Sequence, residues 1–528
     1  MRAPTTLLRW RDVYREADLY KAAIRVYTKP LFQWRKALSR STDGRTLYDM
    51  AARGLRGLDA LHRALTDQSF GFRPALARHY NFNGKHRTLY LAPWEDRIVD
   101  FLLYRVLNRR LHAWFSPDSY AYRESTYGLD TCQARIAAAV RAAAGPLYIV
   151  KRDIADCFAS VSHPLLFEQL ATLVARGDYL ERLLQQRIRF TYSDGDSLHE
   201  AQVGIPFGTA SACLLANIAL SPVDREMEGR PGVSYFRYAD DLLLVGDDRR
   251  ATADAAGRLE HAIAALWLRC KPTHSIDLVI EARPAPQPLD CGAHVNHVAA
   301  VACPADHTED RFTAAASFRH LGLLFRSAGG VGLSRDKRRK LQNLFRFAFR
   351  RRERSWRKAG DARERARVLC TIAAETLAQG VRNVAIFDYY LKHVDDERQW
   401  SALDRWLAEE VLSRVFGGHK RGHFGRLGFA ELRALGLPSL VHRRRLLRRG
   451  AIPSAFFVWQ RQRATRAFGR TVARPAATPA FSSFPQAAAS NMPVREGGCL
   501  STGVMESVAA EAELRFHRPS FRGLDVGR

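Results

Sequence analysis

Three aspartates at the ends of short apolar runs are the residues best suited to chemistry. Asp153 ends the β-like run LYIVKRD, and Asp240 and Asp241 lie between the runs VSYFRY and LLLVG. Carboxylates at such positions are costly to bury unless cations compensate their charge. Two Mg²⁺ ions would do so, because hard divalent cations prefer oxygen ligands and an ion pair stabilises the oxygens of phosphoryl transfer. Taken alone, either cluster is equally well explained as an acidic hairpin turn.

The charge of the whole chain narrows the class of partner. Lys and Arg total 82 against 54 Asp and Glu, which gives a formal net charge of +28 over 528 residues. This balance favours a polyanion, first nucleic acid and second an anionic membrane surface. No apolar run reaches the length of a membrane-spanning helix, and the N-terminus lacks the apolar stretch of a signal peptide. We therefore expect an intracellular, cytoplasmic protein with no membrane partner.

The cysteines and histidines give no support for zinc. The eight cysteines are scattered and form no Cys-x-x-Cys pair. His419 and His423 have the spacing H-x-x-x-H, but they stand in a Gly-rich basic segment without a nearby acidic residue. We expect them to face phosphate or to have no ligand, because a structural zinc site needs four converging side chains.

The aspartates must be positioned by a mixture of strands and helices. Apolar β-rich runs predict strands over 147–154 and 233–246, and alternation around Asn83-Gly84 predicts a hairpin over 76–92. Helical spacing predicts helices in 1–75, 95–114, 163–192, 211–220 and 251–268. A basic helix is predicted over 334–358, with Leu341, Leu344, Phe345 and Phe349 on one side, and helical patterning continues to about 449.

These segments, in this order, resemble the motif blocks of reverse transcriptases. FRYADDLLL is similar to the Tyr-x-Asp-Asp signature, DIADCFASV resembles the first catalytic block, and GIPFGTASACLLANIAL resembles the block between them. GKHRTLYLAPWEDRIVDFLLYRVLNRRLHAWFSPDSYAYR resembles the fingers blocks of bacterial reverse transcriptases of the group II intron, diversity-generating, retron-like and defence-associated types. FRHLGLLF resembles the segment that grips the primer end. The resemblance covers roughly residues 80–330.

The resemblance implies an α+β fold, a right-hand polymerase. Its fingers and palm would combine an antiparallel sheet with helices, followed by a helical thumb and a helical C-terminal extension. The implied parts are an N-terminal helical region 1–75, fingers 76–145, a palm with interleaved fingers helices 146–333, a basic thumb 334–400, an extension 401–469 and a flexible tail 470–528.

The resemblance also assigns site residues. It implies Asp153, Asp240 and Asp241 as catalytic carboxylates, with Ile154 beside them in the metal set. The implied nucleotide-binding residues are Lys85, Arg87, Phe158, Gly204, Pro206, Phe207, Gly208 and Lys271, and the implied primer-end residues are Tyr238, Leu321 and Gly322. Phe158 would exclude a 2′-hydroxyl, and Phe207 stands where many relatives carry Gln. The expected nucleic-acid contacts are Arg338, Arg339, Lys340, Arg350, Arg351, Arg352, Arg443, Arg444 and Arg445.

The implied activity is RNA-directed DNA synthesis with two Mg²⁺ ions, for which Mn²⁺ could substitute. The implied partners are dNTPs, the DNA product and an RNA template, with a structured noncoding RNA and self-association as further expectations. A defence-associated role in a bacterial cytoplasm is favoured by analogy alone. The alternatives are a catalytically silent RNA-binding scaffold, an RNA-templated RNA polymerase, which Phe158 disfavours, and a mobile-element or diversity-generating enzyme.

Overall fold

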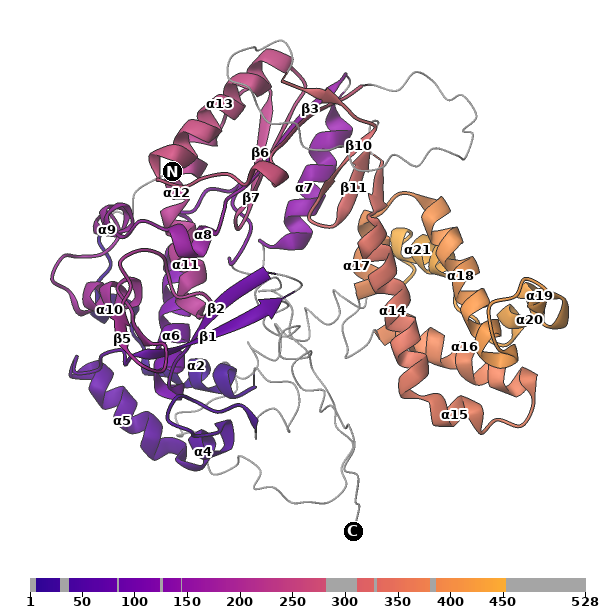
Figure 1. Ribbon diagram of the computed structural model, residues 1–528, viewed down its shortest axis with the longest axis horizontal. Coiled ribbons are helices and arrows are strands. Elements are labelled where there is room, and N and C mark those ends of the chain that lie inside the picture. Colours follow the sequence, from indigo (N-terminus) through magenta and orange to yellow (C-terminus); the bar gives the residue numbers. More distant parts are fainter. Residues whose placement is uncertain are drawn as a thin grey trace.

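The computed structural model has a mixed architecture of helices and mostly antiparallel sheets, so the predicted α+β class is confirmed (Figure 1). It describes residues 6–28, 38–82, 85–123, 127–143, 145–281, 311–326, 330–379 and 386–452. The predicted turn at 83–84, the tail 470–528 and the end of the extension 401–469 lie outside these residues. None of the described helices is long and apolar enough to cross a membrane.

A five-stranded sheet, called the central sheet below, contains the predicted catalytic strands. Its strands, in spatial order, are β6 (Val233–Tyr238), β7 (Asp241–Gly246), β3 (Leu147–Asp153), β8 (Ile276–Ile280) and β9 (Thr313–Ala314). All neighbours are antiparallel except β8 and β9. The predicted strands over 147–154 and 233–246 are therefore confirmed.

The central strands are mostly apolar because both faces of the sheet are covered. Along β7, Leu243 and Val245 join the larger core cluster, whereas Leu242 and Leu244 join the smaller one. The helices beside these cores are α7 (Leu129–Ala142), α11 (Ala210–Ala219), α12 (Ser221–Met227) and α13 (Arg249–Ala265). Successive side chains of β7 thus point to opposite faces of the sheet, and this alternation fixes the face to which each carboxylate at the end of the strand points.

A second sheet lies beside the first helices. Its strands, in spatial order, are β2 (Lys85–Leu91), β1 (Ala75–Phe82), β4 (Thr191–Ser193) and β5 (Leu198–Glu200). The β1–β2 pairing is antiparallel, so the predicted hairpin is confirmed. The helices of this region are α1 (Trp10–Val13), α2 (Glu16–Thr28), α4 (Leu47–Ala52), α5 (Gly54–Thr66) and α6 (Trp94–Arg110).

The prediction of one helical segment over 163–192 is wrong in the middle of the segment and at its end. The segment forms α9 (His163–Ala171) and α10 (Tyr179–Ile188), and then enters β4. The break occurs at Gly177, which has φ of +75°, and Asp178 begins α10 by accepting a hydrogen bond from the Leu180 amide at 2.9 Å. The Asp178 carboxylate also accepts from the Trp10 amide, a contact 168 residues away that no local pattern encodes.

The C-terminal part is helical and lies to one side of the sheets in Figure 1. A three-stranded sheet leads into it, with β10 (Ser317–His320), β11 (Leu323–Arg326) and β12 (Val331–Leu333). The helices are α14 (Arg335–Arg351), α15 (Glu353–Arg357), α16 (Ala362–Gln379), α17 (Ile386–His393), α18 (Glu397–Phe416), α19 (His423–Arg426), α20 (Phe429–Ala434) and α21 (Leu440–Arg448). The predicted basic helix 334–358 is thus two helices, divided at Arg352.

Candidate active site

The three aspartates meet at one edge of the central sheet. Asp153 ends β3 and is paired in register with Asp241, the first residue of β7. Asp240 precedes Asp241 in the turn from β6, where Ala239 has a φ of +59°. The Ile154 amide donates to the Asp240 carbonyl at 3.1 Å, which joins this turn to the end of β3. Two motifs that are far apart in the sequence therefore bring the three aspartates together in space.

Burial and mutual repulsion shift the acidity of this cluster. Burial, followed by the charges of Asp241 and Asp153, raises the pKa of Asp240 to about 6. Burial also raises the pKa of Asp241, opposed by Lys151 and assisted by Asp153. Excess negative charge in a low-dielectric site is the condition that a bound cation relieves.

Two lysines partly compensate the carboxylates. The Lys271 ammonium donates to Asp153, and the Lys151 ammonium lies 3.6 Å from Asp241 Oδ1. Burial lowers the pKa of Lys271, but its hydrogen bond to Asp153 and the nearby carboxylates raise it overall. In the described part of the chain no three His, Cys, Asp or Glu side chains converge as a metal-binding group.

A cluster of two aromatic rings and an arginine lies beside the catalytic edge. Phe158, on the short helix α8 (Cys157–Ser160), is half-buried, and its ring is 5.4 Å from that of Phe207 in an edge-on arrangement. The Arg87 guanidinium of β2 lies 5.0 Å from the Phe207 ring centroid. Three of the predicted nucleotide-binding residues are therefore in contact, although they are up to 120 residues apart in sequence. The side chain of Lys85, at the start of β2, is outside the described part.

The loop before α11 is held against Phe158 by its backbone. The Ile205 amide donates to the Phe158 carbonyl at 2.7 Å, and the Gly204 amide donates to Val161 at 2.8 Å. Gly204 has φ of +82°, and an added Cβ would lie 2.8 Å from the Ala159 carbonyl oxygen. Only glycine fits this close approach. Pro206 and Gly208 continue the same loop, and its far end enters α11.

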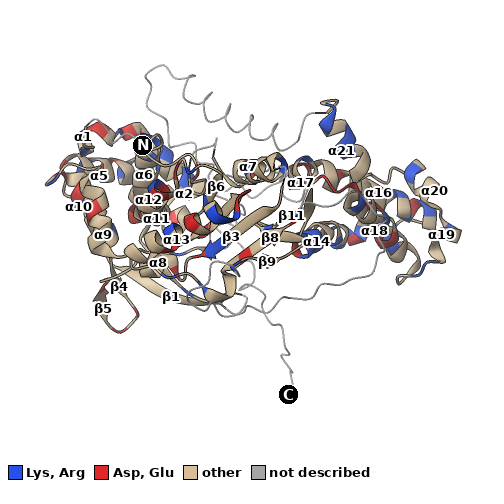
Figure 2. Cartoon of the chain, turned by 90° about the horizontal axis from the view of Figure 1, so that it is seen from above, with Lys and Arg blue, Asp and Glu red and all other residues tan. Residues whose placement is uncertain are grey.

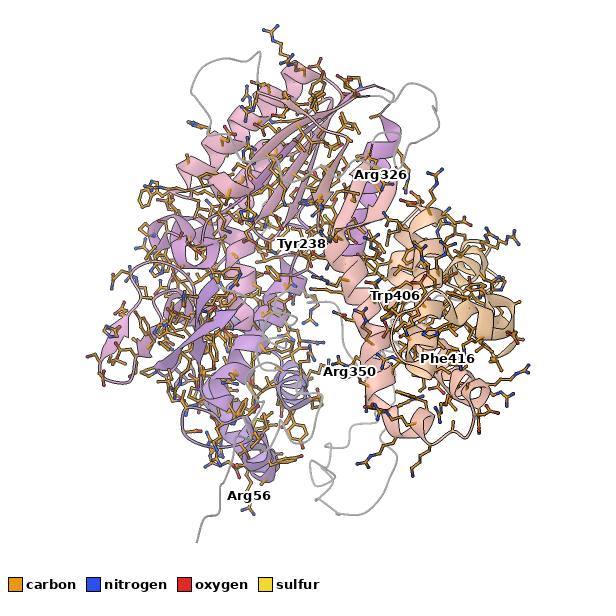
Figure 3. The ribbon with its side chains drawn as sticks, turned by 45° about the vertical axis from the view of Figure 1, so that its right-hand side comes forward. Arg56, Tyr238, Arg326, Arg350, Trp406 and Phe416 are labelled. Atoms are coloured by element: carbon orange, nitrogen blue, oxygen red, sulfur yellow. The ribbon has the colours of Figure 1, made fainter. Side chains whose placement is uncertain are left out.

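The predicted primer-end residues lie on two elements. Tyr238 is buried at the end of the central sheet, in the middle of the molecule (Figure 3), and burial raises its pKa. Leu321 and Gly322 form the β10–β11 turn with positive φ values of 47° and 83°. The Gln133 amide donates to the Leu321 carbonyl at 2.7 Å, so α7 fixes this turn relative to the sheet.

Basic side chains are concentrated on α14 and α21 (Figure 2). Those of α14 predicted to bind nucleic acid are exposed: Arg338, Arg339, Lys340, Arg350 and Arg351. Arg335, Arg338 and Arg339 line a pocket of about 280 Å³ between α14 and α18. Arg352 is instead paired with Glu375 of α16. Figure 3 labels Arg350 on the part of α14 that faces the rest of the chain.

The arginines of α21 are engaged within the protein. Arg443 binds both carboxylate oxygens of buried Asp388 at 2.6 and 2.9 Å. Arg444 is itself buried and donates to the Val394 carbonyl at 3.0 Å, and Arg445 pairs with Glu397. These contacts join α21 to α17 and α18, and the nucleic-acid contact expected of these arginines remains a prediction.

The paired histidines do not converge on a common ligand. His423 is buried and its ring contacts the carbonyls of Gly417 and Gly418 at 3.2 Å. His419 is exposed and lies 4.0 Å from a carboxylate oxygen of Glu410. The geometry gives His423 a structural role in this turn.

The sequence analysis missed one buried residue next to the catalytic turn. Arg237 of β6 has no exposed surface and pairs with Asp224, which is also fully buried. The available signal was the placement of an arginine inside the apolar run VSYFRY. An arginine in such a run is stable in the core only when it is paired with an opposite charge, which predicts a buried carboxylate partner.

Comparison with known proteins gives the class of this part of the chain. The family model described as reverse transcriptase (RNA-dependent DNA polymerase) matches residues 78–273, which contain all three aspartates. This segment is therefore similar to the domain of RNA-directed DNA polymerases, which are nucleotidyltransferases. Enzymes with this domain generally use divalent metal ions.

Two curated proteins are similar to the chain over part of its length. The putative COX1/OXI3 intron 1 protein of Saccharomyces cerevisiae is 25% identical over 191 residues, covering 35% of this chain and 22% of that protein. Protein YkfC of Escherichia coli is 22% identical over 208 residues, covering 33% of this chain and 54% of that protein. The chain thus matches about a fifth to a half of the length of these relatives.

One solved structure with detectable similarity is that of apo telomerase from Candida tropicalis truncated from its C-terminal domain. It is 11% identical and aligns over 56% of this chain and 63% of that chain, with a TM-score of 0.34.

Proposed function

We propose that this chain is an RNA-directed DNA polymerase that extends a primer with dNTPs by two-metal-ion catalysis. The observation that carries the proposal is the meeting of Asp153, Asp240 and Asp241 at one sheet edge, inside the segment that matches the reverse transcriptase family. The raised pKa of Asp240 supports it, because mutual repulsion among carboxylates is what divalent cations relieve.

The donor set fits Mg²⁺, with Mn²⁺ as a substitute. All three side chains offer oxygen, and the backbone of Ile154 lies beside them. When bound, the ions would neutralise charge that develops on the transferred phosphoryl group. Lys151 and Lys271 would release Asp241 and Asp153 to the ions, and Lys271 would then be available to the leaving pyrophosphate.

The neighbouring cluster of Arg87, Phe158 and Phe207 would contact the nucleotide. Arg87, held over the Phe207 ring, presents a cation suited to the triphosphate, and Lys85 begins the same strand. The ring of Phe158 would exclude the 2′-hydroxyl, which its incomplete burial supports. Phe207 belongs to the loop of Gly204, Pro206 and Gly208, and its ring contacts both Phe158 and Arg87. The template–nucleotide pair would therefore rest on an aromatic ring at this point.

The predicted divisions of a right-hand polymerase would then apply to the whole chain, with fingers at 76–145, palm at 146–333 and thumb at 334–400. Tyr238, Leu321 and Gly322 would contact the primer end. Arg339 and Arg350 are 11 residues apart on α14, which is three turns, so they share one face. We propose that this face, with Arg338, Lys340 and Arg351 near it, contacts the phosphates of the template–primer duplex.

For the biological role, the proposal is that the enzyme works with a structured noncoding RNA in bacterial defence. Its support is limited to the unusual Phe207 and the long helical C-terminal part. Sequencing the RNA that co-purifies with the full chain tests it, because one dominant structured RNA is expected. A heterogeneous RNA pool would instead favour a mobile-element or diversity-generating enzyme.

Incorporation of labelled dNTPs on an RNA template with a DNA primer tests the activity itself. The parent chain should synthesise DNA with Mg²⁺, and Asp240→Ala should lower the rate by about 10³-fold or more, because several kcal/mol of transition-state stabilisation is lost. Incorporation of NTPs in preference to dNTPs would indicate an RNA polymerase. No incorporation by the folded parent would indicate a silent scaffold.

A further inference from the structure

Arg237 is a fully buried guanidinium whose five N–H donors all have acceptors. Its Nε and Nη2 bind the two carboxylate oxygens of Asp224, each at 2.6 Å. Nη2 also donates to Ser119 Oγ at 2.7 Å, and Nη1 donates to Asn217 Oδ1 at 3.0 Å. The fifth bond runs from Nη1 to the Ala239 carbonyl at 3.2 Å. A buried guanidinium with every donor satisfied fixes its neighbours rigidly.

The partners of Arg237 come from elements on several sides of the catalytic turn. Asp224 is on α12 and Asn217 is on α11, and the Asn217 amide donates to the Ala121 carbonyl at 2.9 Å. Ser119 forms an isolated parallel bridge with Arg237 through the backbone. Tyr235 adds a hydrogen bond to Asp224 at 2.9 Å. The side chain therefore links the turn to two helices and to the segment that precedes α7.

The turn itself needs such support. Ala239 has φ of +59°, a left-handed conformation that is strained for a residue with a Cβ. The peptide groups on both sides of Asp240 are held, because Arg237 binds the Ala239 carbonyl and the Ile154 amide binds the Asp240 carbonyl. With both flanking peptides fixed, the direction of the Asp240 side chain is also restricted.

We propose that Arg237 is a positioning residue, which sets the Asp240 carboxylate for divalent-ion binding through the carbonyl of Ala239. The inference rests on the proposed function, since it requires that Asp240 bind a metal ion. Arg237 does not touch the ion or a substrate. Its effect passes through one backbone carbonyl, as outer hydrogen bonds orient the ligands of other metal sites.

A second buried arginine of the same sheet provides a matched control. Arg152 of β3 is 4% exposed and binds Asp277 and Glu260 in charged hydrogen bonds, as Arg237 binds Asp224. Its hydrogen bonds within the described residues do not reach 239–241. Replacing either arginine by lysine keeps the charge and removes a bidentate contact, so both variants should lose thermal stability.

The test is Mn²⁺ binding to the metal-free full chain, measured by electron paramagnetic resonance, together with the melting temperature of each variant. Arg237→Lys should raise the apparent dissociation constant of Mn²⁺ by about tenfold, whereas Arg152→Lys should leave it unchanged despite a similar loss of stability. Asn217→Ala is a milder change that removes one acceptor of Arg237 Nη1. It should also raise the dissociation constant of Mn²⁺, but by less.

Each outcome separates the inference from the proposed function. Equal Mn²⁺ affinity in folded Arg237→Lys and the parent would overturn the positioning role and leave the metal site intact. An equal loss of affinity in both lysine variants would also overturn it, because a general loosening of the sheet would then be the cause. If the parent binds no Mn²⁺, the proposed metal site fails, and the inference fails with it.

Discussion

The catalytic edge of the central sheet and the helix α14 are built in opposite ways. The edge contains carboxylates that repel one another and a residue with positive φ, and buried hydrogen bonds from distant segments hold it in place. In α14 the cap and the apolar spacing are locally favourable: Ser334 caps its first turn, Leu341, Phe345 and Phe349 are buried on one side, and arginines face solvent on the other.

The contrast separates two kinds of functional surface. Strain and repulsion are stored where chemistry is proposed and are offset by the surrounding structure. A surface that contacts phosphates in general needs only exposed positive charge on a stable support. Substitutions that relieve local cost should therefore stabilise the edge, and substitutions of the exposed arginines of α14 should change binding without changing stability.

The largest effect is expected for Asp240→Asn in chelated, metal-free protein. The pKa of Asp240 is raised to about 6 from its ordinary 3.8, so the folded state binds the proton more tightly than the unfolded chain. The carboxyl's contribution to stability is therefore present below pH 4 and is lost as the pH rises from 4 to 6. At pH 7.5 the variant should exceed the parent in free energy of unfolding by at most about 3 kcal/mol, less after allowance for partial exposure.

Denaturant unfolding at pH 5 and pH 7.5 checks this result, with a gain at pH 5 of about half that at pH 7.5. Asp388→Asn, in the C-terminal helices, should have the opposite sign, because it leaves the half-buried Arg443 without its bidentate partner. Stabilisation by both variants, or by neither, would remove the distinction between the two regions.

The sequence predicted the two regions unequally. The apolar spacing, cap and basic face of α14 are local, and the aspartates occupy motif positions that can be recognised in order along the chain. The residues that hold the aspartates were not predictable from local patterns: Arg237 bonds to Ser119, which is 118 residues away. The break in 163–192 was missed for the same reason, since Asp178 is fixed by Trp10 as well as by its own helix.

A smaller effect, on binding alone, is expected for the double substitution of Arg350 and Arg351 by Ala. Both arginines are exposed, and neither has a carboxylate partner within the part of the chain that the structure describes. The magnitude of the salt slope for template–primer binding should fall by about 1.4–1.8, because each arginine that neutralises one phosphate adds roughly 0.7–0.9 to it. The free energy of unfolding should stay within about 0.5 kcal/mol of the parent.

Affinity for a template–primer duplex across a salt series measures the slope. Arg352→Ala is the control, because Arg352 already pairs with Glu375 and should contribute less to the slope. A slope equal to that of the parent in the double variant would mean that this part of α14 faces solvent or a protein partner.

The smallest expected effect compares another residue with positive φ, Trp267 at the end of α13, with the exposed side of α14. Trp267 has φ of +58° and is 68% exposed, so its backbone is strained and its ring packs little. Its amide donates to Ala264 at 2.8 Å, and that of Leu268 donates to Ile263 at 3.2 Å, which is the Schellman arrangement that usually has glycine at this position. Trp267→Gly removes about 1–2 kcal/mol of strain and adds about 0.5–1 kcal/mol of unfolded-state entropy. It should thus raise the free energy of unfolding by about 0.5–1 kcal/mol, whereas Trp267→Ala, which keeps a Cβ, should give no gain.

Phe347→Gly on the exposed side of α14 should instead lower the free energy of unfolding by about 1 kcal/mol, because a helix interior disfavours glycine. Thermal unfolding of the three variants measures the difference, and a gain for Trp267→Ala equal to that for Trp267→Gly would show that the exposed ring, and not the backbone, carries the cost.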